Sequence, residues 1–266
     1  MSTPHVLAEM QGQVLWLTLN RPEQRNPLSS QMIAALHAAI DSANQDPSVR
    51  VIVIAGSGPV FSAGHDLREM APQPDESPEA RERRVRQILV DCSRMMLAIV
   101  HSPKAILACV QGTATAAGCQ LVSACDLAIA SEDVGFCTPG VNIGIFCTTP
   151  LVGIGRTIHR KHAMEMALTG DLVPAAEAVR IGLVNRAVPA TELREATQAL
   201  ADKIASRSAQ GIRSGKEAFY RQVEMPLEEA FRYANEAMLC GMTSSGDAEE
   251  GTRAFLEKRK AQWGEA

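Results

Sequence analysis

The sequence predicts an α/β protein whose C-terminal region is entirely helical. Over roughly the first 190 residues, short apolar segments typical of strands alternate with segments of helical periodicity. After Pro189 only helical patterns remain. Of the 266 residues, 46% are hydrophobic and 21% are charged, which is the composition of a globular protein. We therefore expect an α/β core at residues 1–195 and a C-terminal helical region at residues 196–266.

Apolar runs that end at residues unable to continue a ladder mark the expected strands. Val14–Leu19 stops before Pro22, because proline has no N–H to donate. Residues 51–55 and 104–110 are apolar almost throughout, which is typical of strands in a sheet that is covered on both faces. Residues 127–130 form a further strand-like run. Together with the helical segments between them, these runs indicate the sheet of an α/β core.

Helical periodicity follows the first strand and dominates the C-terminal region. Ser29 or Ser30 is expected to cap an amphipathic helix. A charged segment at residues 75–86 leads into an apolar helix at residues 88–100. Four helices are expected at the end of the chain, over residues 192–206, 212–224, 227–242 and 247–263. Amphipathic helices of this kind cover either the core or a neighbouring subunit.

Charge and composition exclude several classes of function. The chain has 26 Lys and Arg against 30 Asp and Glu, a formal net charge of −4, whereas nucleic-acid binding requires a concentrated basic surface. Aromatic residues make up only 4%, which also disfavours a base-stacking platform. No apolar run approaches the roughly 18 residues of a membrane span, and the N-terminus lacks a signal-peptide pattern. We expect a soluble, cytoplasmic protein without a nucleic-acid or membrane partner.

The 7 cysteines show no metal-binding or redox spacing. No Cys-x-x-Cys pair occurs, and most of the cysteines lie in apolar runs, where a free thiol behaves as a small hydrophobic side chain. Histidines and carboxylates likewise lack the spacing of a metal site. The sequence thus predicts reduced thiols and neither a metal nor a separate cofactor.

Two stretches rich in small residues directly follow apolar strands. The first is residues 59–67, Pro-Val-Phe-Ser-Ala-Gly-His-Asp-Leu, and the second is residues 110–121, Val-Gln-Gly-Thr-Ala-Thr-Ala-Ala-Gly-Cys-Gln-Leu. Small residues let the backbone approach a ligand closely, and a helix that begins there directs N–H groups outward. Two such turns facing one another supply two convergent donors, which stabilise a carbonyl that becomes an enolate or a tetrahedral species.

These stretches, together with other motifs, resemble the enoyl-CoA hydratase/isomerase (crotonase) superfamily. The other motifs are Leu-Asn-Arg-Pro at 19–22, Asn-Pro-Leu at 26–28, Cys-Asp-Leu at 125–127, Met-Glu-Met-Ala-Leu-Thr-Gly at 164–170 and Ala-Val-Arg-Ile-Gly-Leu-Val at 178–184. The resemblance spans residues 15–263 and implies a ClpP-like spiral of β-β-α turns with a C-terminal helical trimerisation region. It also implies a homotrimer or hexamer and acyl-CoA thioesters of fatty-acid metabolism as ligands, with coenzyme A as part of the substrate.

The resemblance further implies roles for residues at matching positions. The backbone N–H groups of His65 and Ala117 would form an oxyanion hole. Four other positions match the substrate site of the family: Ala63, Asp66, Leu67 and Gly118. Phe255 and Lys258 match positions that contact CoA bound to the adjoining subunit.

The chain departs from the family at the two catalytic glutamates of the hydratases, where Gln120 and Gly140 stand instead. A glutamine can hold a water molecule but cannot accept and return its proton near neutral pH, and a glycine has no side chain to offer. Between Val134 and Met164 the sequence contains no Asp or Glu. Because each positioned acid or base contributes roughly 10²–10⁴-fold, we expect no efficient hydration. In this respect the chain is similar to enoyl-CoA hydratase domain-containing proteins that lack both glutamates.

Two classes of function remain open. The first is an enzyme that acts through enolate stabilisation, such as a decarboxylase, an isomerase or a thioesterase. Residues 63–66 and 138–144 are similar to methylmalonyl-CoA decarboxylase, in which loss of carbon dioxide needs no base, although residues 145–149 lack the tyrosine of that branch. The second is a non-catalytic module that binds acyl-CoA.

Side chains near the two turns are further candidates. The imidazole of His65 can donate to a carboxylate or phosphate and changes charge near physiological pH. Asp66 and Glu69 flank the first turn. Cys119 and Ser62 are possible nucleophiles, but the sequence shows no recognisable activating partner for either.

Overall fold

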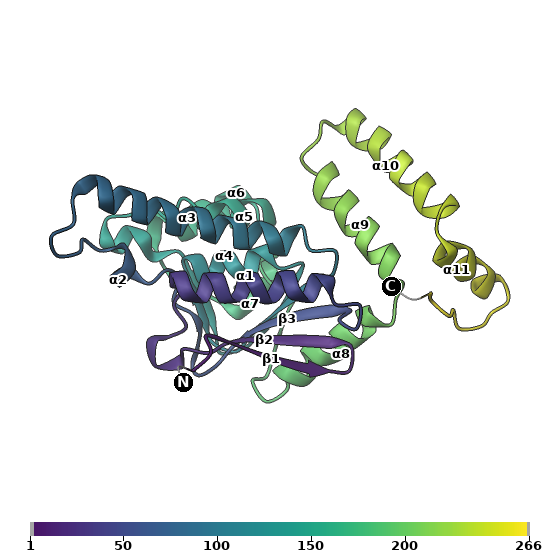
Figure 1. Ribbon diagram of the computed structural model, residues 1–266, viewed down its shortest axis with the longest axis horizontal. Helices are drawn as coiled ribbons and strands as arrows, with labels where there is room; N and C mark the ends of the chain where they lie inside the picture. The colour runs from purple at the N-terminus through teal and green to yellow at the C-terminus, as the bar shows by residue number, and fades with distance from the viewer. Residues whose placement is uncertain (1–2, 265–266) are drawn as a thin grey trace.

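The computed structural model describes residues 3–264, which form two β-sheets, surrounding helices and a helical arm (Figure 1). The larger sheet has six strands in the order β1-β2-β3-β5-β7-β10. Its strands are β1 (Val6–Gln11), β2 (Val14–Leu19), β3 (Val51–Gly56), β5 (Ala105–Val110), β7 (Leu127–Ser131) and β10 (Arg186–Val188). β1 runs antiparallel to β2, and the other neighbouring pairs are parallel. The four strands expected from apolar runs are therefore confirmed.

A smaller sheet contains the strands that lead to the two turns. It consists of β4 (Val60–Ser62), β6 (Thr113–Thr115), β8 (Gly135–Cys137) and β9 (Val173–Pro174), in that order. β4, β6 and β8 are mutually parallel, and each follows a strand of the larger sheet after a short loop. Because the carboxyl ends of parallel strands meet at the same edge of a sheet, the turns after these three strands lie side by side.

Apolar side chains cover both faces of the larger sheet. Along β3, Ile52 and Ile54 lie on one face and Val51 and Val53 on the other, and all four are fully buried. The first face packs against α1 (Ser30–Gln45), α3 (Pro78–Val100) and α4 (Ala117–Ala124), and the second against α8 (Leu193–Ala205). Burial on both sides explains why this strand is apolar throughout.

The remaining elements are short. They are the helices α2 (Leu67–Met70), α5 (Pro150–Thr157), α6 (Arg160–Thr169) and α7 (Ala175–Arg180), and the 3-10 helices η1 (Pro22–Gln24) and η2 (Pro139–Ile143). Within residues 3–264, no helix has both the length and the apolar content that crossing a membrane requires.

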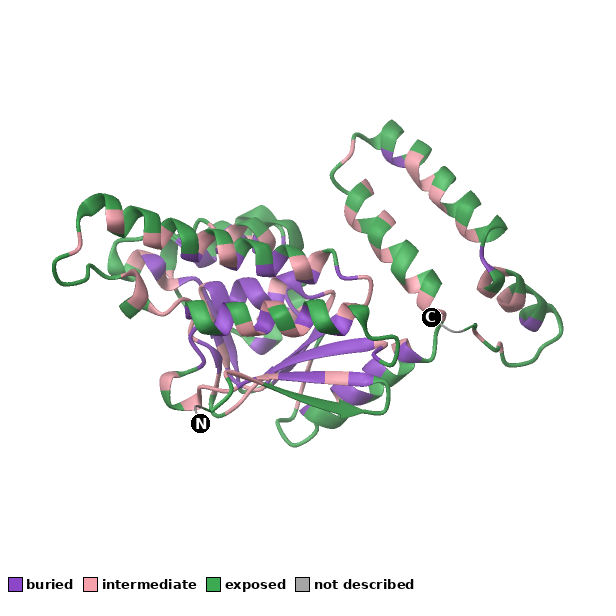
Figure 2. Ribbon diagram, in the orientation of Figure 1, coloured by how far each residue is buried: buried purple, intermediate pink, exposed green. Residues whose placement is uncertain are grey.

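Three helices project from the core as an arm (Figure 1). They are α9 (Ala209–Gln222), α10 (Leu227–Thr243) and α11 (Gly246–Leu256), and we call residues 209–264 the C-terminal arm. Buried residues concentrate in the core, whereas the arm is largely exposed (Figure 2). Its exposed apolar side chains include Phe219, Leu227, Phe231, Met238, Leu239, Met242, Phe255 and Leu256. The division expected between residues 195 and 196 falls inside α8.

A largely buried ion pair, with side chains 8% and 16% exposed, joins the C-terminal arm to the core. Lys216 of α9 donates to Asp126 Oδ2 at 2.8 Å, and the Tyr220 hydroxyl donates to Asp126 Oδ1 at 2.9 Å. Lys216 Nζ also donates to the carbonyl oxygens of Ile99 and Lys104, at 3.1 and 3.0 Å. Burial lowers the pKa of Lys216 and raises the pKa of Tyr220. These bonds fix α9 beside the strand ends of the larger sheet.

The helix predicted over residues 247–263 ends at Leu256, so that prediction is wrong for the last residues. Lys258 has a left-handed φ of 55°, a conformation that terminates helices. Beyond it the chain folds back, and Trp263 Nε1 donates to the carbonyl oxygen of Ser206 at 2.9 Å. Helical periodicity does not reveal such a return, because it depends on partners far away in the sequence.

Candidate active site

The turns that follow β4 and β6 are in direct contact. A β-carbon added to Gly64 would lie 3.0 Å from Ala116 Cβ and 3.2 Å from the backbone nitrogen of Ala117. A β-carbon on Gly118 would lie only 2.4 Å from the carbonyl oxygen of Ser62. Glycine at 64 and 118 therefore lets the two backbones approach one another, as the small-residue pattern predicts. Gly64 also has a φ of 84°, which other residues rarely adopt.

Hydrogen bonds join the loop at residues 25–28 to the first turn and support it. Ala63 N–H donates to the carbonyl oxygen of Arg25 at 2.9 Å, and Leu28 N–H donates to that of Gly64 at 2.7 Å. Asn26 is fully buried, and its Nδ2 donates to the carbonyl oxygens of Ser57 and Val60, at 2.9 and 2.8 Å. The Asn-Pro-Leu motif thus supports the site, a role that the sequence did not reveal.

Ala116 stands in a strained conformation at the start of α4. Its φ of 49° and ψ of −117° lie outside the regions that L-residues with a β-carbon favour. A hydrogen bond from Ala116 N–H to the carbonyl oxygen of Cys137, at 2.8 Å, holds this turn. Strain of this kind is concentrated at functional sites, where the surrounding structure enforces it.

Two backbone N–H groups remain available at this place. Within the described part of the chain, the N–H groups of His65 and Ala117 make no hydrogen bond to another residue. Ala117 is the first residue of α4, and the first bond inside that helix runs from Gln120 N–H to Ala116 O, at 3.0 Å. The N–H of Ala117 therefore belongs to the positive end of a helix, where developing negative charge is stabilised.

The imidazole of His65 is enclosed without a hydrogen-bond partner on either ring nitrogen among residues 3–264. Burial lowers the pKa of His65, because desolvation disfavours the imidazolium more than the neighbouring Leu28 backbone and Glu69 stabilise it. The ring is therefore neutral at physiological pH. A neutral imidazole presents one donor and one acceptor to a bound group.

The carboxylates that flank the first turn have structural partners. Asp66 accepts a hydrogen bond from Arg68 N–H at 3.0 Å and so caps α2. Glu69 Oε2 accepts from both the N–H and the hydroxyl of Ser30, each at 2.7 Å. Leu67 is 54% exposed. These contacts occupy both carboxylates, which leaves His65 as the side chain of this turn with unused hydrogen-bonding atoms.

The two positions of the missing glutamates differ in their surroundings. Gln120 is buried, and its Oε1 has no partner within residues 3–264, as is also true of Thr138 Oγ1. A β-carbon on Gly140 would lie 2.4 Å from the carbonyl oxygen of Ile145 and 2.8 Å from Cys147 Sγ. The loop at residues 145–147 therefore fills the space that a side chain at position 140 would need.

Neither candidate nucleophile is activated. Ser62 Oγ donates to the carbonyl oxygen of Asn26 at 2.8 Å, so its proton is engaged by the backbone rather than by a base. Cys119 is fully buried, and burial strongly raises the pKa of its thiol. The described residues contain no cluster of three or more His, Cys, Asp or Glu side chains suited to a metal ion.

Phe255 and Lys258 lie in a different part of the molecule. Phe255 is 82% exposed on α11, and Lys258 directly follows that helix. Figure 1 shows α11 at the outer side of the C-terminal arm, away from the N-terminus of α4 in the core. Within a single chain, Phe255 and Lys258 therefore lie apart from His65 and Ala117.

Two large hollows also lie away from the two turns. One, of about 950 Å³, lies between the core and the start of the arm and is bordered by Arg50, Lys104 and Arg213. The other, of about 1030 Å³, lies among α9, α10 and α11. Both are spaces beside an arm that projects from a single chain, and neither is lined by His65 or Ala117.

Comparison with known proteins gives consistent matches over nearly the whole chain. Residues 9–266 match the family model described as enoyl-CoA hydratase/isomerase. The rat protein named enoyl-CoA hydratase domain-containing protein 3, mitochondrial, is 41% identical over 93% of this chain and 80% of its own length. A Thermus thermophilus protein named putative enoyl-CoA hydratase is 37% identical over 93% of this chain and 96% of its own.

Solved structures give the same result. An enoyl-CoA hydratase from Mycobacterium smegmatis has a TM-score of 0.91 and 43% identity, with 98% of this chain and 99% of that chain covered. Human enoyl-CoA hydratase domain-containing protein 3 has a TM-score of 0.92 and 39% identity, with coverage of 97% and 100%. The predicted crotonase spiral with C-terminal helices is thereby confirmed.

The expected cytoplasmic location is contradicted by the same comparisons. The similar rat, mouse, zebrafish and human proteins are all named mitochondrial. The expectation rested on free thiols and on the lack of a signal-peptide pattern and of a long apolar run; free thiols indicate a reducing environment but do not distinguish one reducing compartment from another.

Proposed function

Because this chain belongs to the enoyl-CoA hydratase/isomerase family, we propose that it binds acyl-CoA thioesters and stabilises negative charge on the thioester oxygen. The donors are the backbone N–H groups of His65 and Ala117. The observation that carries this proposal is the contact between the two turns, in which Gly64 lies against Ala116 and Ala117 and leaves both N–H groups without an acceptor in the described chain. Backbone donors held in advance need no reorganisation when charge develops on the carbonyl oxygen.

Hydration is not the reaction that this site performs well. Adding water across a double bond requires a group that takes a proton from water and one that returns a proton to carbon. Gln120 cannot exchange a proton near neutral pH, and position 140 is closed by the loop at 145–147. Among nearby carboxylates, Asp66 caps α2 and Glu69 binds Ser30. The site therefore retains charge stabilisation without a free acid–base pair.

Reactions that form an enolate without a protein base fit these residues best. In the decarboxylation of a 2-carboxyacyl thioester, the bond between the α-carbon and the carboxylate breaks, and its electron pair enters the enolate. Carbon dioxide leaves, and a proton from solvent then restores the α-carbon. The neutral His65 ring and the unpaired Gln120 Oε1 and Thr138 Oγ1 are polar atoms available for orienting such an acyl group. The alternative is a module that binds acyl-CoA without turnover.

Assembly as a homotrimer or hexamer is part of this proposal. The C-terminal arm exposes many apolar side chains, and the core exposes another set: Ile143, Ile145, Phe146, Val152, Leu168 and Leu172. Apolar surfaces of this extent are typical of subunit interfaces. In such an assembly, Phe255 and Lys258 would contact CoA bound to the neighbouring subunit, which accounts for their distance from the two turns in one chain.

A variant that removes one donor tests the proposal. Ala117→Pro deletes the N–H at the first position of α4; because a residue before proline disfavours the φ of 49° that Ala116 adopts, circular dichroism and the urea midpoint of the variant are first compared with those of the unaltered protein. We expect a 10²–10³-fold loss of turnover, or weaker thioester binding if the protein has no turnover. The assay measures binding and product formation with acetyl-, crotonyl-, malonyl- and methylmalonyl-CoA.

Ala209→Pro provides the matched control. Ala209 is the first residue of α9, and the preceding Ser208 has a φ of −56° and a ψ of 124°, which a following proline favours. This variant should bind thioesters like the unaltered protein. Equal behaviour of the two proline variants, or no binding of any CoA ester by the unaltered protein, would refute the proposal.

A further inference from the structure

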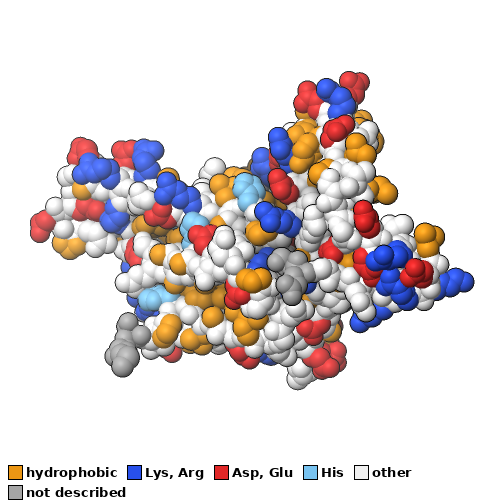
Figure 3. All heavy atoms as spheres, turned by 45° about the vertical axis from the view of Figure 1, so that its right-hand side comes forward, with side chains coloured by type: hydrophobic (Ala, Val, Ile, Leu, Met, Phe, Trp, Pro, Cys, Tyr) orange, Lys and Arg blue, Asp and Glu red, His pale blue; other side chains and the backbone are white. Residues whose placement is uncertain are grey.

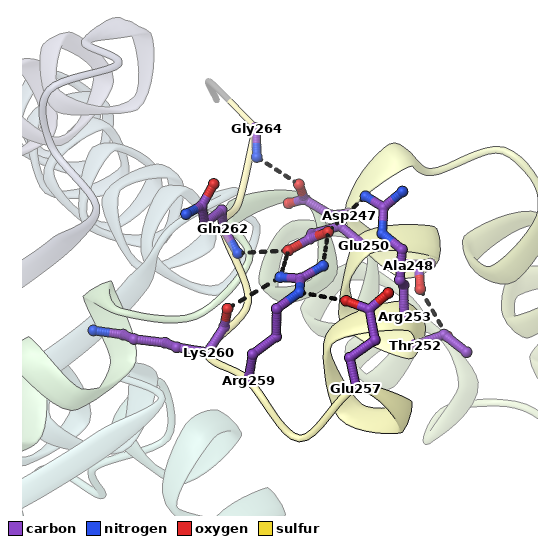
Figure 4. Close-up of polar contacts among 10 residues, drawn as sticks. All are labelled: Asp247, Ala248, Glu250, Thr252, Arg253, Glu257, Arg259, Lys260, Gln262 and Gly264. Carbon is purple, nitrogen blue, oxygen red and sulfur yellow. Dashed lines mark hydrogen bonds and ion pairs between the residues drawn. The ribbon is translucent and has the colours of Figure 1, made fainter.

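The end of the chain returns along α11 as a strap. We call residues 258–264 the C-terminal strap (Figure 4). Gln262 N–H donates to Glu250 Oε1 at 2.9 Å, and Gly264 N–H donates to Asp247 Oδ1 at 2.8 Å. Asp247 Oδ2 in turn accepts from the hydroxyl of Ser208 at 2.6 Å. The strap thereby connects α11 to the beginning of the arm.

Glu250 is the centre of this arrangement. Its two oxygens accept from Arg259 Nη1 and Nη2, at 2.6 and 2.9 Å, from Arg253 Nη2 at 2.7 Å and from the Gln262 N–H (Figure 4). Its side chain is 12% exposed, although it lies on a surface helix. Hydrogen bonds from Arg259 and Arg253 hold the pKa of Glu250 well below its usual range. One carboxylate therefore joins α11 to two separate points of the strap.

Lys258 lies at the bend between α11 and the strap. Its N–H donates to the carbonyl oxygen of Phe255 at 3.2 Å, and the N–H of Arg259 donates to that of Ala254 at 3.0 Å. This helix ending usually has glycine at the left-handed position, because glycine adopts a φ near 55° without strain. Here a lysine stands at this position, between α11 and the bonds that Arg259 and Gln262 make to Glu250.

Charge is distributed unevenly around the bend. Arg259 is paired with Glu250 and Glu257, and Arg253 with Glu250. In contrast, the ammonium groups of Lys258 and Lys260 have no hydrogen bond or ion pair within residues 3–264. Figure 3 shows the charged side chains gathered at this far end of the arm. Two free cations thus lie close in sequence to Phe255, which is 82% exposed.

We propose that Glu250 is a positioning residue for the nucleotide part of acyl-CoA. It holds Arg259 and the Gln262 backbone, and so keeps Lys258 in its left-handed conformation at the end of the helix that carries the exposed ring of Phe255. A cation and an exposed aromatic ring three residues apart suit a phosphate and an adenine base. The inference rests on the proposed function, in which this part of the arm contacts CoA bound to the next subunit.

Glu250→Gln tests the inference, with acetyl-CoA and S-acetylpantetheine as the two probes. Acetylpantetheine has the same thioester but lacks the nucleotide. We expect the affinity of Glu250→Gln for acetyl-CoA to fall about tenfold, the size of a lost charge-assisted contact, while its affinity for acetylpantetheine is unchanged. The control is Glu257→Gln, which loses a carboxylate on Arg259 but no contact with Gln262, and should change acetyl-CoA affinity less than twofold.

Lys258→Gly shows whether Glu250 acts through the lysine. This variant removes the ammonium and relieves the backbone, so acetyl-CoA affinity should fall while the thermal midpoint stays equal or rises. Adding Glu250→Gln to Lys258→Gly should then cause no further loss of acetyl-CoA affinity. Subunit assembly is followed for every variant by size-exclusion chromatography.

Five results would overturn the inference. The first is unchanged acetyl-CoA affinity in Glu250→Gln. The second is an equal loss for both probes or a loss of assembly, which would make Glu250 merely structural. The third is a full further loss when the two substitutions are combined. The fourth is an unaltered protein that binds neither probe, which would refute the proposed function itself. The fifth is binding of acetylpantetheine without any preference for acetyl-CoA, which would leave that function standing and remove only the role of Glu250.

Discussion

Gly118 and Ser62 are so close that a β-carbon on the glycine would lie 2.4 Å from the serine carbonyl oxygen. Ser62 ends β4, and Gly118 is the second residue of α4, so this contact joins the strand that leads into the His65 turn to the helix that begins at Ala117. The absence of a side chain at position 118 therefore allows the two turns that carry the proposed N–H donors to approach one another. Atoms at 2.4 Å cannot be accommodated without moving backbone, since neither partner is a flexible side-chain end.

Gly118→Ala should separate the two turns. We expect it to lower the free energy of unfolding by about 1–3 kcal/mol, the usual range for overpacking, and to weaken thioester binding more than this loss of stability explains. Urea unfolding and titration with acetyl-CoA measure the two effects. Gly155→Ala in α5 is the control, because a β-carbon there meets nothing within 4 Å, and it should not destabilise the protein. Similar binding by both variants would contradict the importance of the contact.

Gly140→Ala should destabilise the protein, because its β-carbon would meet the carbonyl oxygen of Ile145 at 2.4 Å. The expected loss is about 1–3 kcal/mol in the free energy of unfolding. Gly241→Ala in α10 is the control, since that position is open. If both variants unfold at the same urea concentration, then the loop at residues 145–147 does not close position 140 as described here.

Gln120→Glu should restore a trace of hydration. The substitution places an ionisable group where the amide now lies, and a single positioned acid or base is worth roughly 10²-fold or more. The test is the fall in ultraviolet absorbance of crotonyl-CoA as its double bond is hydrated. Gln120→Met, of similar length but without an exchangeable proton, should stay at the rate of the unaltered protein. A brisk rate in the unaltered protein would defeat the argument about missing acids.

Lys216→Met should be strongly destabilising, because it leaves Asp126 buried without its cation. Breaking a buried pair in this way costs about 3–5 kcal/mol in the free energy of unfolding. Tyr220→Phe removes one bond to the same carboxylate and should cost about 1.5 kcal/mol. Urea unfolding is again the measurement, and combining Lys216→Met with Asp126→Asn should cost less than the sum of the two.

Arg156→Met provides the comparison for the buried pair. Arg156 binds Glu224 at 2.8 Å, but both side chains are about 60% exposed, at 61% and 59%. An exposed pair of this kind contributes less than about 1 kcal/mol. If Lys216→Met were no more harmful than Arg156→Met, then the Lys216–Asp126 pair would not anchor the arm.

The core could be predicted from the sequence wherever burial leaves a local pattern. β3 and β5 are apolar on both faces, and Ser29 caps α1 by accepting from Met32 N–H at 3.2 Å, so these elements were recognisable. β1 was not predicted, because it is an exposed edge strand without alternation. The strands of the smaller sheet have two or three residues each, too few to show a period.

The candidate site, like the core, could be predicted only where the sequence has a local pattern. The two small-residue turns were recognisable because each lies within a few residues of a strand, and the family resemblance then assigned His65 and Ala117 within them. Two other features could not be predicted, because they depend on contacts that no local pattern encodes. These are the closure of position 140 by the loop at residues 145–147 and the hydrogen bond from Gln262 to Glu250. The strained φ of Ala116 was equally invisible, since alanine gives no sign of an unusual backbone angle.

The stability of the protein should fall at acidic pH through His65. Burial lowers the pKa of this imidazole in the folded state, whereas the unfolded chain has the ordinary value of about 6.5. As pH falls below about 6.5, the unfolded chain therefore binds a proton that the folded protein refuses, and the free energy of unfolding decreases. The decrease continues until the lower folded pKa is reached, with a slope of at most about 1.4 kcal/mol per pH unit for one group.

His65→Gln should remove this contribution, because the amide keeps hydrogen-bonding atoms but cannot bind a proton in this range. Urea unfolding at a series of pH values between about 7.5 and 5 measures the difference, and the unaltered protein should lose stability relative to the variant as pH falls. His101→Gln, at an exposed position, serves as the control for replacing a histidine by glutamine elsewhere in the chain. Parallel curves for His65→Gln and the unaltered protein would show that the imidazole accepts a proton in place, and the neutral ring assigned to the site would have to be abandoned.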